Sequence, residues 1–177
     1  MWINLDAKAN LEHWQNSAAR RAKIGGVRMR ISSVWNSGLL VLTGIVAAAS
    51  AQEPPQPAKL SRADIAGEAF DRPEMIRQTA NGNTTLDLTS FLSSDKKFAS
   101  GMYRSGSVRL EINEPYGVDE FMYFLEGGVT LTSSDGVVQV IGAGEAVTIP
   151  KEWTGVWDTQ GYTKIWVIYS KDGSGLE

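Results

Sequence analysis

Alternating apolar and polar residues dominate the chain from residue 85 to residue 169. The apolar positions are rich in valine, isoleucine, leucine and aromatic residues, and short glycine-containing segments interrupt them. A period of two is typical of strands with one buried face. Strands at this spacing without intervening helices indicate an antiparallel sandwich or barrel. We predict strands over 86–92, 98–104, 107–113, 120–125, 129–132, 137–141, 146–149, 155–158 and 163–169, with turns at 127–128, 135–136 and 142–144.

The segment 29–51 has the pattern of a secretory signal peptide. Arg30 precedes an apolar run centred on residues 39–49, and the small residues of an A-x-A cleavage site end at Ala51. The run contains polar residues and is shorter than the roughly 18–20 apolar residues that span a bilayer. We therefore expect a periplasmic or secreted protein, cleaved after Ala51, with no stable membrane anchor afterwards. The alternative is a signal anchor that follows a cytoplasmic amphipathic helix.

The flanking segments complete the expected organisation. If translation starts at Met29, residues 1–28 are a non-native or over-called extension. Residues 52–84 form a proline-rich lead-in and loop with at most a short helical turn, residues 85–171 form the barrel, and residues 172–177 form a tail. The part that remains after cleavage is long enough for one domain with a core of its own.

Charge and composition exclude several classes of function. The whole chain carries −3 and residues 1–51 carry +4, so residues 52–177 carry −7. An acidic domain lacks the basic surface that nucleic acids and anionic lipids require, and we expect no nucleic-acid partner. The chain has no cysteine, and its only histidine, His13, precedes the domain. Disulfides, thiol catalysis and a Ser-His-Asp triad are therefore excluded from the barrel.

Motifs within the barrel resemble those of the cupin superfamily. Glu120 and Gly127 are separated by six residues, and Gly144 and Pro150 by five, as in the framework of the two cupin motifs. The segments FLEGGVTL, GAGEAVTIPKEW, GVWDT and YTKIWVIY resemble the single-domain cupins grouped with ureidoglycine aminohydrolase and with the cupin of ethanolamine utilisation. The resemblance covers about residues 85–170 and implies an all-β, antiparallel jelly-roll barrel.

The chain departs from the metal-binding pattern that the resemblance implies. A typical cupin holds a divalent metal with two histidines and a glutamate in its first motif and one histidine in its second. Here the first two histidine positions are Glu114 and Tyr116, the glutamate is kept as Glu120, and the last histidine position is Gly155. One or two oxygen ligands do not suit a transition metal. We expect no metal and no cofactor; a weakly held, oxygen-ligated metal is the alternative.

Glu120 is the candidate catalytic residue. The resemblance places its side chain inside the barrel, and strand alternation puts Met122 and Phe124, two candidate ligand-binding residues, on the same face. A carboxylate in an apolar cavity can act as a general acid or base, or can bind a ligand amine. The alternative is an exposed carboxylate at the rim. Glu114 and Tyr116 are further ligand-binding candidates, because the proline between them fixes a turn where both motif positions would enter the site.

Trp153 and Trp157 complete the candidate ligand-binding set. Residues 153, 155, 157 and 159 share one face by strand alternation, so both indoles are expected to face the barrel interior on either side of Gly155. Two tryptophans around a glycine would leave a slot for a flat or apolar ligand. The alternative is that both rings only fill the core.

The remaining charged candidates are Lys151, expected on the loop after Pro150, and Lys164. Lys164 lies next to Ile165 near the start of the last predicted strand. A lysine in such a place is most often a charge at the edge of a sheet. We therefore rank it below Glu120, with contact to a ligand as the alternative.

Two hypotheses for function follow from these residues. The first is an exported, single-domain cupin that binds a small organic molecule in an aromatic-lined barrel. The second is an enzyme of the aminohydrolase, isomerase or lyase type, metal-independent or only weakly metal-dependent, which uses Glu120 for proton transfer to a small substrate. The jelly-roll fold hosts many activities and does not decide between them. We also expect a homodimer.

Overall fold

The computed structural model describes residues 54–174 and 176. The expected signal peptide, the upstream extension and His13 lie outside the described residues. A short helix α2 (Arg62–Ile65) and a 3-10 helix η2 (Glu68–Asp71) precede the strands. The strands are β1 (Ile76–Ala80), β2 (Asn83–Leu92), β3 (Phe98–Ser105), β4 (Val108–Ile112), β5 (Asp119–Ser133), β6 (Val138–Gly142), β7 (Ala146–Ile149) and β8 (Gly155–Tyr169). No helix in the described part of the chain is long and apolar enough to cross a membrane.

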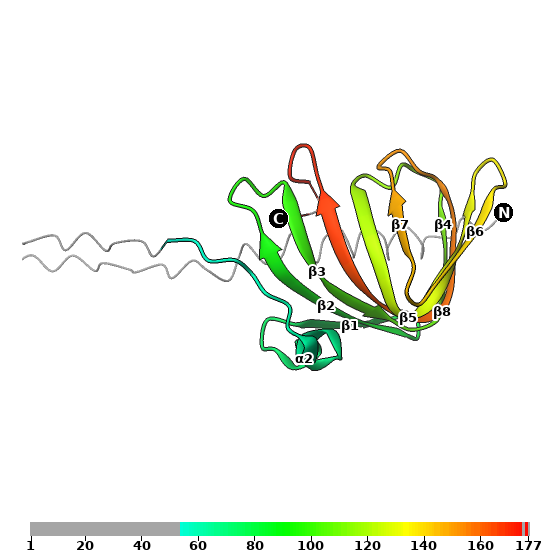
Figure 1. Ribbon diagram of the computed structural model, residues 1–177. Coiled ribbons are helices and arrows are strands. Elements are labelled where there is room, and N and C mark those ends of the chain that lie inside the picture. Colours follow the sequence, from blue (N-terminus) through cyan, green and yellow to red (C-terminus); the bar gives the residue numbers. More distant parts are fainter. Residues whose placement is uncertain (1–53, 175, 177) are drawn as a thin grey trace, which may run out of the picture.

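The strands form a curled antiparallel sheet, and the expected all-β jelly-roll architecture is confirmed (Figure 1). The strand order is β1-β2-β3-β8-β5-β6, with β4 also paired to β8 and β7 also paired to β5. The two long strands, β5 and β8, pair with each other from Asp119 opposite Tyr169 to Ser133 opposite Gly155. Because β5 and β8 also pair with the shorter strands, they run through the whole barrel and position the residues of its interior.

Glycines let β5 and β8 approach closely where the sequence predicted a chain reversal. Gly127 and Gly128 lie inside β5, and the strands predicted over 155–158 and 163–169 are one continuous strand, β8. The pairing of β5 with β8 shifts register on both sides of the two glycines. Gly127 has a φ of +65°, and a Cβ there would collide with the carbonyl oxygen of Gly161. The predicted turn at 127–128 was wrong because glycine also marks β-bulges and close backbone contacts.

The sheet begins with a hairpin that the sequence pattern did not predict. β1 and β2 are joined by Asn81 and Gly82, whose φ angles are +50° and +76°. Positive φ at both central residues is the requirement of a two-residue type I′ turn, which Asn-Gly satisfies best. The segment 52–84, predicted as a lead-in and loop, therefore contains the strand β1, the hairpin turn and the first residues of β2. The short helical turn expected in that segment is α2, which begins with a capping box between Ser61 and Asp64.

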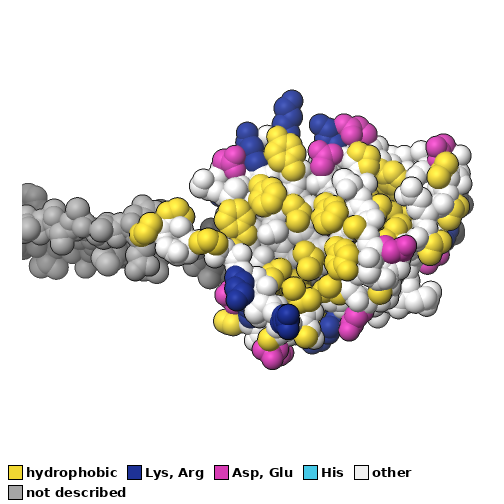
Figure 2. Space-filling view, viewed as in Figure 1, with side chains coloured by type: hydrophobic (Ala, Val, Ile, Leu, Met, Phe, Trp, Pro, Cys, Tyr) yellow, Lys and Arg dark blue, Asp and Glu magenta, His cyan; other side chains and the backbone are white. Residues whose placement is uncertain are grey.

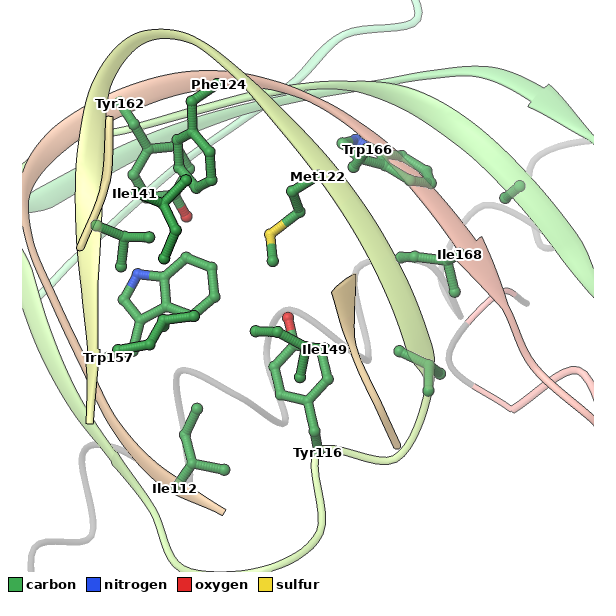
Figure 3. Packing of buried hydrophobic residues seen from close by; sticks show 14 of the residues in the cluster. Ile112, Tyr116, Met122, Phe124, Ile141, Ile149, Trp157, Tyr162, Trp166 and Ile168 are labelled. Carbon is green, nitrogen blue, oxygen red and sulfur yellow. The ribbon is translucent and has the colours of Figure 1, made fainter. Parts of the chain in front are cut away.

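Buried side chains form two clusters on opposite faces of the sheet. The larger cluster fills the barrel interior and includes the residues labelled in Figure 3. The smaller cluster lies on the outer face and consists of Ala69, Phe70, Leu86, Leu88 and Met102. Since Ala69 and Phe70 belong to η2, the segment before the barrel covers part of the outer face. The candidate site lies in the larger, inner cluster.

Candidate functional site

A glutamate and a lysine meet inside the barrel. Glu120 on β5 is 0% exposed and Lys164 on β8 is 2% exposed. The Lys164 Nζ atom lies 2.8 Å from Glu120 Oε1 and 2.9 Å from Met122 Sδ. Lys164 is paired across the strands with Phe124, so its side chain extends along β5 past Met122 to reach Glu120. Inward-facing positions of two neighbouring strands therefore bring opposite charges together.

Tyr116 adds a hydroxyl to this pair from the loop before β5. The hydroxyl donates a 2.5 Å hydrogen bond to Glu120 Oε2, so each carboxylate oxygen accepts from one side chain. Backbone hydrogen bonds hold the loop: the Tyr116 N–H donates to the Trp153 carbonyl at 3.0 Å, and the Gly117 N–H donates to the Lys151 carbonyl at 2.8 Å. The Tyr116 and Trp153 rings also pack edge to face, with centroids 6.3 Å apart. These contacts hold the Tyr116 hydroxyl at the carboxylate.

Three aromatic rings surround the Lys164 ammonium. Its Nζ atom lies 5.2 Å from the ring centre of Trp157, 5.6 Å from that of Tyr162 and 5.7 Å from that of Tyr103. Aromatic faces attract a cation at distances up to about 6 Å. Figure 3 shows the side chains of Trp157, Tyr162 and Met122 pointing into the same part of the barrel interior. The charged pair is thus enclosed by an aromatic lining.

Burial keeps the tyrosines around the pair neutral. Burial and then the nearby Glu120 carboxylate raise the pKa of Tyr116 well above its ordinary value of 10.0. Burial likewise raises the pKa of Tyr162 and of Tyr103. At physiological pH Tyr116 is therefore a hydrogen-bond donor and not a phenolate. The cluster holds one carboxylate and one ammonium, and these two charges cancel.

A pair of this kind is costly for a protein to bury. Two charges lose their hydration, and their mutual attraction often does no more than offset that loss. Apolar side chains of similar volume would often stabilise such an interior as well or better. Stability alone therefore does not account for a charged pair at this position. The Glu120–Lys164 pair therefore marks the barrel interior as the candidate site.

The comparison with protein families agrees with the motifs. Residues 105–164, which include Tyr116, Glu120 and Lys164, match the family described as the EutQ-like cupin domain. This segment is similar to EutQ-like cupins, and it makes up about a third of the chain. The resemblance inferred from the motifs is thereby confirmed. No curated protein matches the sequence.

Two EutQ proteins are among the solved structures that resemble part of this chain. The Clostridium difficile EutQ protein is 20% identical, with a TM-score of 0.45 over 56% of this chain and 78% of that one. A putative ethanolamine utilization protein Q from Salmonella typhimurium is 17% identical, with a TM-score of 0.41 over 55% of this chain and 95% of that one. A DUF861 family protein from Thermotoga maritima is 27% identical, with a TM-score of 0.34 over 37% of this chain and 73% of that one.

The interior of this barrel does not fit the divalent metal that typical cupins hold. Both oxygens of Glu120 already accept hydrogen bonds, from Lys164 and from Tyr116. The Lys164 ammonium lies 2.8 Å from the carboxylate and would repel a second cation there. Within residues 54–174, no three His, Cys, Asp or Glu side chains are grouped so that they could hold a metal ion. In this barrel a lysine neutralises the glutamate.

Most of the predicted site residues lie together around the pair. Glu120, Tyr116, Met122, Phe124 and Trp157 are all buried in the barrel interior. Phe124 packs edge to face on Tyr162, with centroids 5.3 Å apart. The rim position considered for Glu120 does not occur, because its inward-facing side chain is completely covered. Strand alternation placed Met122, Phe124 and Trp157. The resemblance placed Glu120, and the motif position beside the turn at Pro115 placed Tyr116.

Trp153 packs against the inner cluster beside Tyr116, and Glu114 lies outside it. Trp153 precedes β8, so strand alternation does not apply to it; its indole N–H donates to Ser133 Oγ at 3.0 Å. The slot expected at Gly155 is closed, since a Cβ there would lie 2.9 Å from the Trp153 ring and would collide with a β5 carbonyl. Glu114 is exposed, because the chain turns inward only after it, at Tyr116. The structure therefore does not bring Glu114 to the charged pair.

Lys164 is the functional candidate that sequence reasoning ranked too low. It was compared with its immediate neighbour Ile165, which belongs to the opposite face of β8. The residues two positions away on its own face, Tyr162 and Trp166, are both buried. A lysine at the centre of an apolar alternation was therefore the signal that could have identified it.

Proposed function

We propose that this cupin binds a small organic molecule in the barrel, next to the Glu120–Lys164 pair. The observation that carries the proposal is a hydrogen-bonded ion pair with 0% and 2% exposure in an interior made of aromatic and aliphatic side chains. Small-molecule sites are mostly apolar, with a few polar groups that fix the orientation of the ligand. The Lys164 ammonium, the Glu120 carboxylate and the Tyr116 hydroxyl are such groups, and Trp157 and Tyr162 supply flat apolar surface.

A thermal-shift screen of small organic molecules, confirmed by calorimetric titration, tests this proposal. The site variant is the double substitution Glu120→Gln and Lys164→Met, which removes both buried charges. The matched control is Arg109→Met and Asp158→Asn, which removes an exposed ion pair of similar length, 2.7 Å. We expect compounds that stabilise the wild type and the control but not the site variant. Stabilisation of both variants alike would place binding elsewhere and contradict the proposal.

A second candidate function is proton transfer in a small-molecule enzyme. The 2.5 Å hydrogen bond from Tyr116 to Glu120, together with the Lys164 contact, favours it, because a base needs a proton path and a fixed geometry. Glu120 would accept the proton and Tyr116 would donate one. The discriminating variant is Glu120→Gln, which abolishes turnover in an enzyme while ligand binding survives. Turnover that persists in a folded Glu120→Gln protein excludes this role for the carboxylate.

Export is also part of the proposal, and it is supported by the signal-like pattern of residues 29–51. Cell fractionation followed by N-terminal sequencing tests it. We expect mature protein in the periplasm or the medium, beginning at or near Gln52. Full-length protein in the cytoplasmic fraction would contradict export.

We further propose a homodimer that forms through the outer face of β2, β3, β8 and β5. Large apolar side chains are exposed there, and Figure 2 shows hydrophobic side chains gathered over these strands. Phe98 is paired with Tyr169 across the strands and packs on Phe91, and Phe121 and Tyr123 continue the surface along β5. Patches of this kind mark interaction sites. Light scattering should give a dimer for the wild type and a monomer for Phe121→Lys; a monomeric wild type would contradict this.

A further inference from the structure

We propose that Lys164 forms an imine with a small, neutral aldehyde or ketone bound in the barrel. The inference rests on the proposed function, because the carbonyl compound would occupy the same site. It goes further by naming the class of ligand and the atom that reacts with it. Three observations carry it: the charge balance of the site, the aromatic lining, and the contact between an amine nitrogen and a carboxylate oxygen.

The charge balance favours a neutral ligand. Glu120 and Lys164 neutralise each other at 2.8 Å. A ligand with a net charge would bring an uncompensated charge into an interior where burying one costs several kcal/mol. A neutral carbonyl compound avoids this cost, and its oxygen can accept a hydrogen bond from the ammonium or from the Tyr116 hydroxyl.

The lining favours a flat or small apolar body next to the carbonyl group. Trp157, Tyr162 and Tyr103 face the Lys164 nitrogen at 5.2, 5.6 and 5.7 Å from their ring centres. The thioether of Met122 is a further neighbour of this nitrogen, at 2.9 Å. Aromatic rings and a thioether offer contact area and few hydrogen bonds. A planar carbonyl compound matches such surroundings better than a polyhydroxylated molecule does.

The contact between Lys164 and Glu120 supplies a proton path for imine formation. The Glu120 carboxylate takes a proton from the Lys164 ammonium, and the freed nitrogen lone pair attacks the carbonyl carbon. A C–N bond forms, the C=O π bond breaks, and the oxygen receives the proton that Glu120 took up. The resulting carbinolamine loses its oxygen as water, which carries away two protons of the former ammonium. The product is a protonated imine beside a carboxylate, so no redox step occurs and the net charge of the site is unchanged.

Reductive trapping of the native full-length protein tests the proposal. The protein is incubated with benzaldehyde or acetaldehyde and sodium cyanoborohydride, which fixes an imine as a stable amine, and peptide mass spectrometry then locates the modified lysines. Lys151, whose side chain is 45% exposed, is the internal control for ordinary surface reactivity. Because Glu120 lies 2.8 Å from the Lys164 nitrogen and can accept its proton, whereas Lys151 is 3.7 Å from its nearest carboxylate and open to solvent, we expect labelling of Lys164 at least about tenfold faster than that of Lys151.

The same experiment separates failure of this inference from failure of the proposed function. The double variant Glu120→Gln and Lys164→Met should keep its Lys151 labelling and lose the fast site. Labelling of Lys164 no faster than that of Lys151, or only after unfolding in urea, overturns the imine. If benzaldehyde and its alcohol, benzyl alcohol, still raise the melting temperature of the wild type but not of the double variant, binding stands and only the imine is refuted. Absence of both trapping and stabilisation refutes the imine.

Discussion

Replacement of Lys164 by methionine isolates the energetic role of the buried pair. Methionine has a similar length but no charge, so the Glu120 carboxylate keeps the Tyr116 hydroxyl and loses the ammonium that lies 2.8 Å away. The remaining charge is completely buried. Removing one partner of a buried ion pair costs about 3–5 kcal/mol, mostly because the other charge is left uncompensated. We predict a loss of this size in the free energy of unfolding.

Two controls make this magnitude interpretable. Adding Glu120→Gln to Lys164→Met removes both charges. The free energy of unfolding of this double variant should be within about 1 kcal/mol of the wild-type value, or higher. Arg109→Met breaks a pair of similar length, 2.7 Å, in which the side chains are 59% and 41% exposed. Exposed pairs contribute little, so this control should change the free energy of unfolding by less than about 1 kcal/mol.

Urea denaturation followed by circular dichroism measures these differences for each variant under the same conditions. The decisive comparison is between Lys164→Met and the double variant. If the single substitution costs no more than Arg109→Met, the pair is not desolvated in solution and the reasoning fails. If the double variant is as unstable as Lys164→Met, packing around residue 164 rather than charge determines the loss.

Three further predictions follow from the structure. Tyr116→Phe removes a donor to a buried carboxylate and should lower the free energy of unfolding by about 1.5–3 kcal/mol, whereas the exposed Tyr123→Phe should change it little. Urea titration of both proteins checks this, and equal losses would contradict it. Gly127→Ala should lower the free energy of unfolding by several kcal/mol, because the added Cβ would meet the Gly161 carbonyl. Gly136→Ala adds a Cβ in open space at a φ of +87°, and should lower it by only about 1–2 kcal/mol. Thermal melting of the two variants measures the difference. The pKa values of Tyr103, Tyr116 and Tyr162 are raised in the fold, so the folded state holds the phenol protons more tightly than the unfolded chain does. Stability should be complete below the ordinary pKa of 10.0 and fall as pH rises above it; phenolate absorbance from these residues that appears while circular dichroism is still native would contradict this.

Much of the fold could be predicted because a period of two is a strong signal when one face of a strand is buried. That signal placed most of the strands and put Glu120, Met122 and Phe124 on one inward face. The pattern was misleading at glycine, which occurs both in turns and in β-bulges. The Gly127-Gly128 pair is a bulge inside β5, whereas Asn81-Gly82 is a hairpin turn. Only the pairing with β8, far along the chain, distinguishes the two cases.

The candidate site could be predicted only in part, for a related reason. Glu120 and Trp157 were identified from one strand each, but the partner of Glu120 is on another strand, 44 positions along the chain. Local statistics describe a lysine in a strand as an edge charge, and a buried carboxylate on the facing strand reverses that expectation. Glu114 was assigned an inward position by extending a motif position into a loop, where no fixed period holds. Trp153, also outside a strand, is partly exposed and packs against the inner cluster. The structure supplied the contact between strands that the sequence pattern lacks.

Native mass spectrometry of the protein with the best compound from the thermal-shift screen tests the central claim most directly. It counts bound molecules on the wild type and on the double variant Glu120→Gln and Lys164→Met under the same conditions. The account predicts one small molecule per chain on the wild type and none on the double variant. Equal occupancy of the two proteins would show that the buried pair is not the binding site.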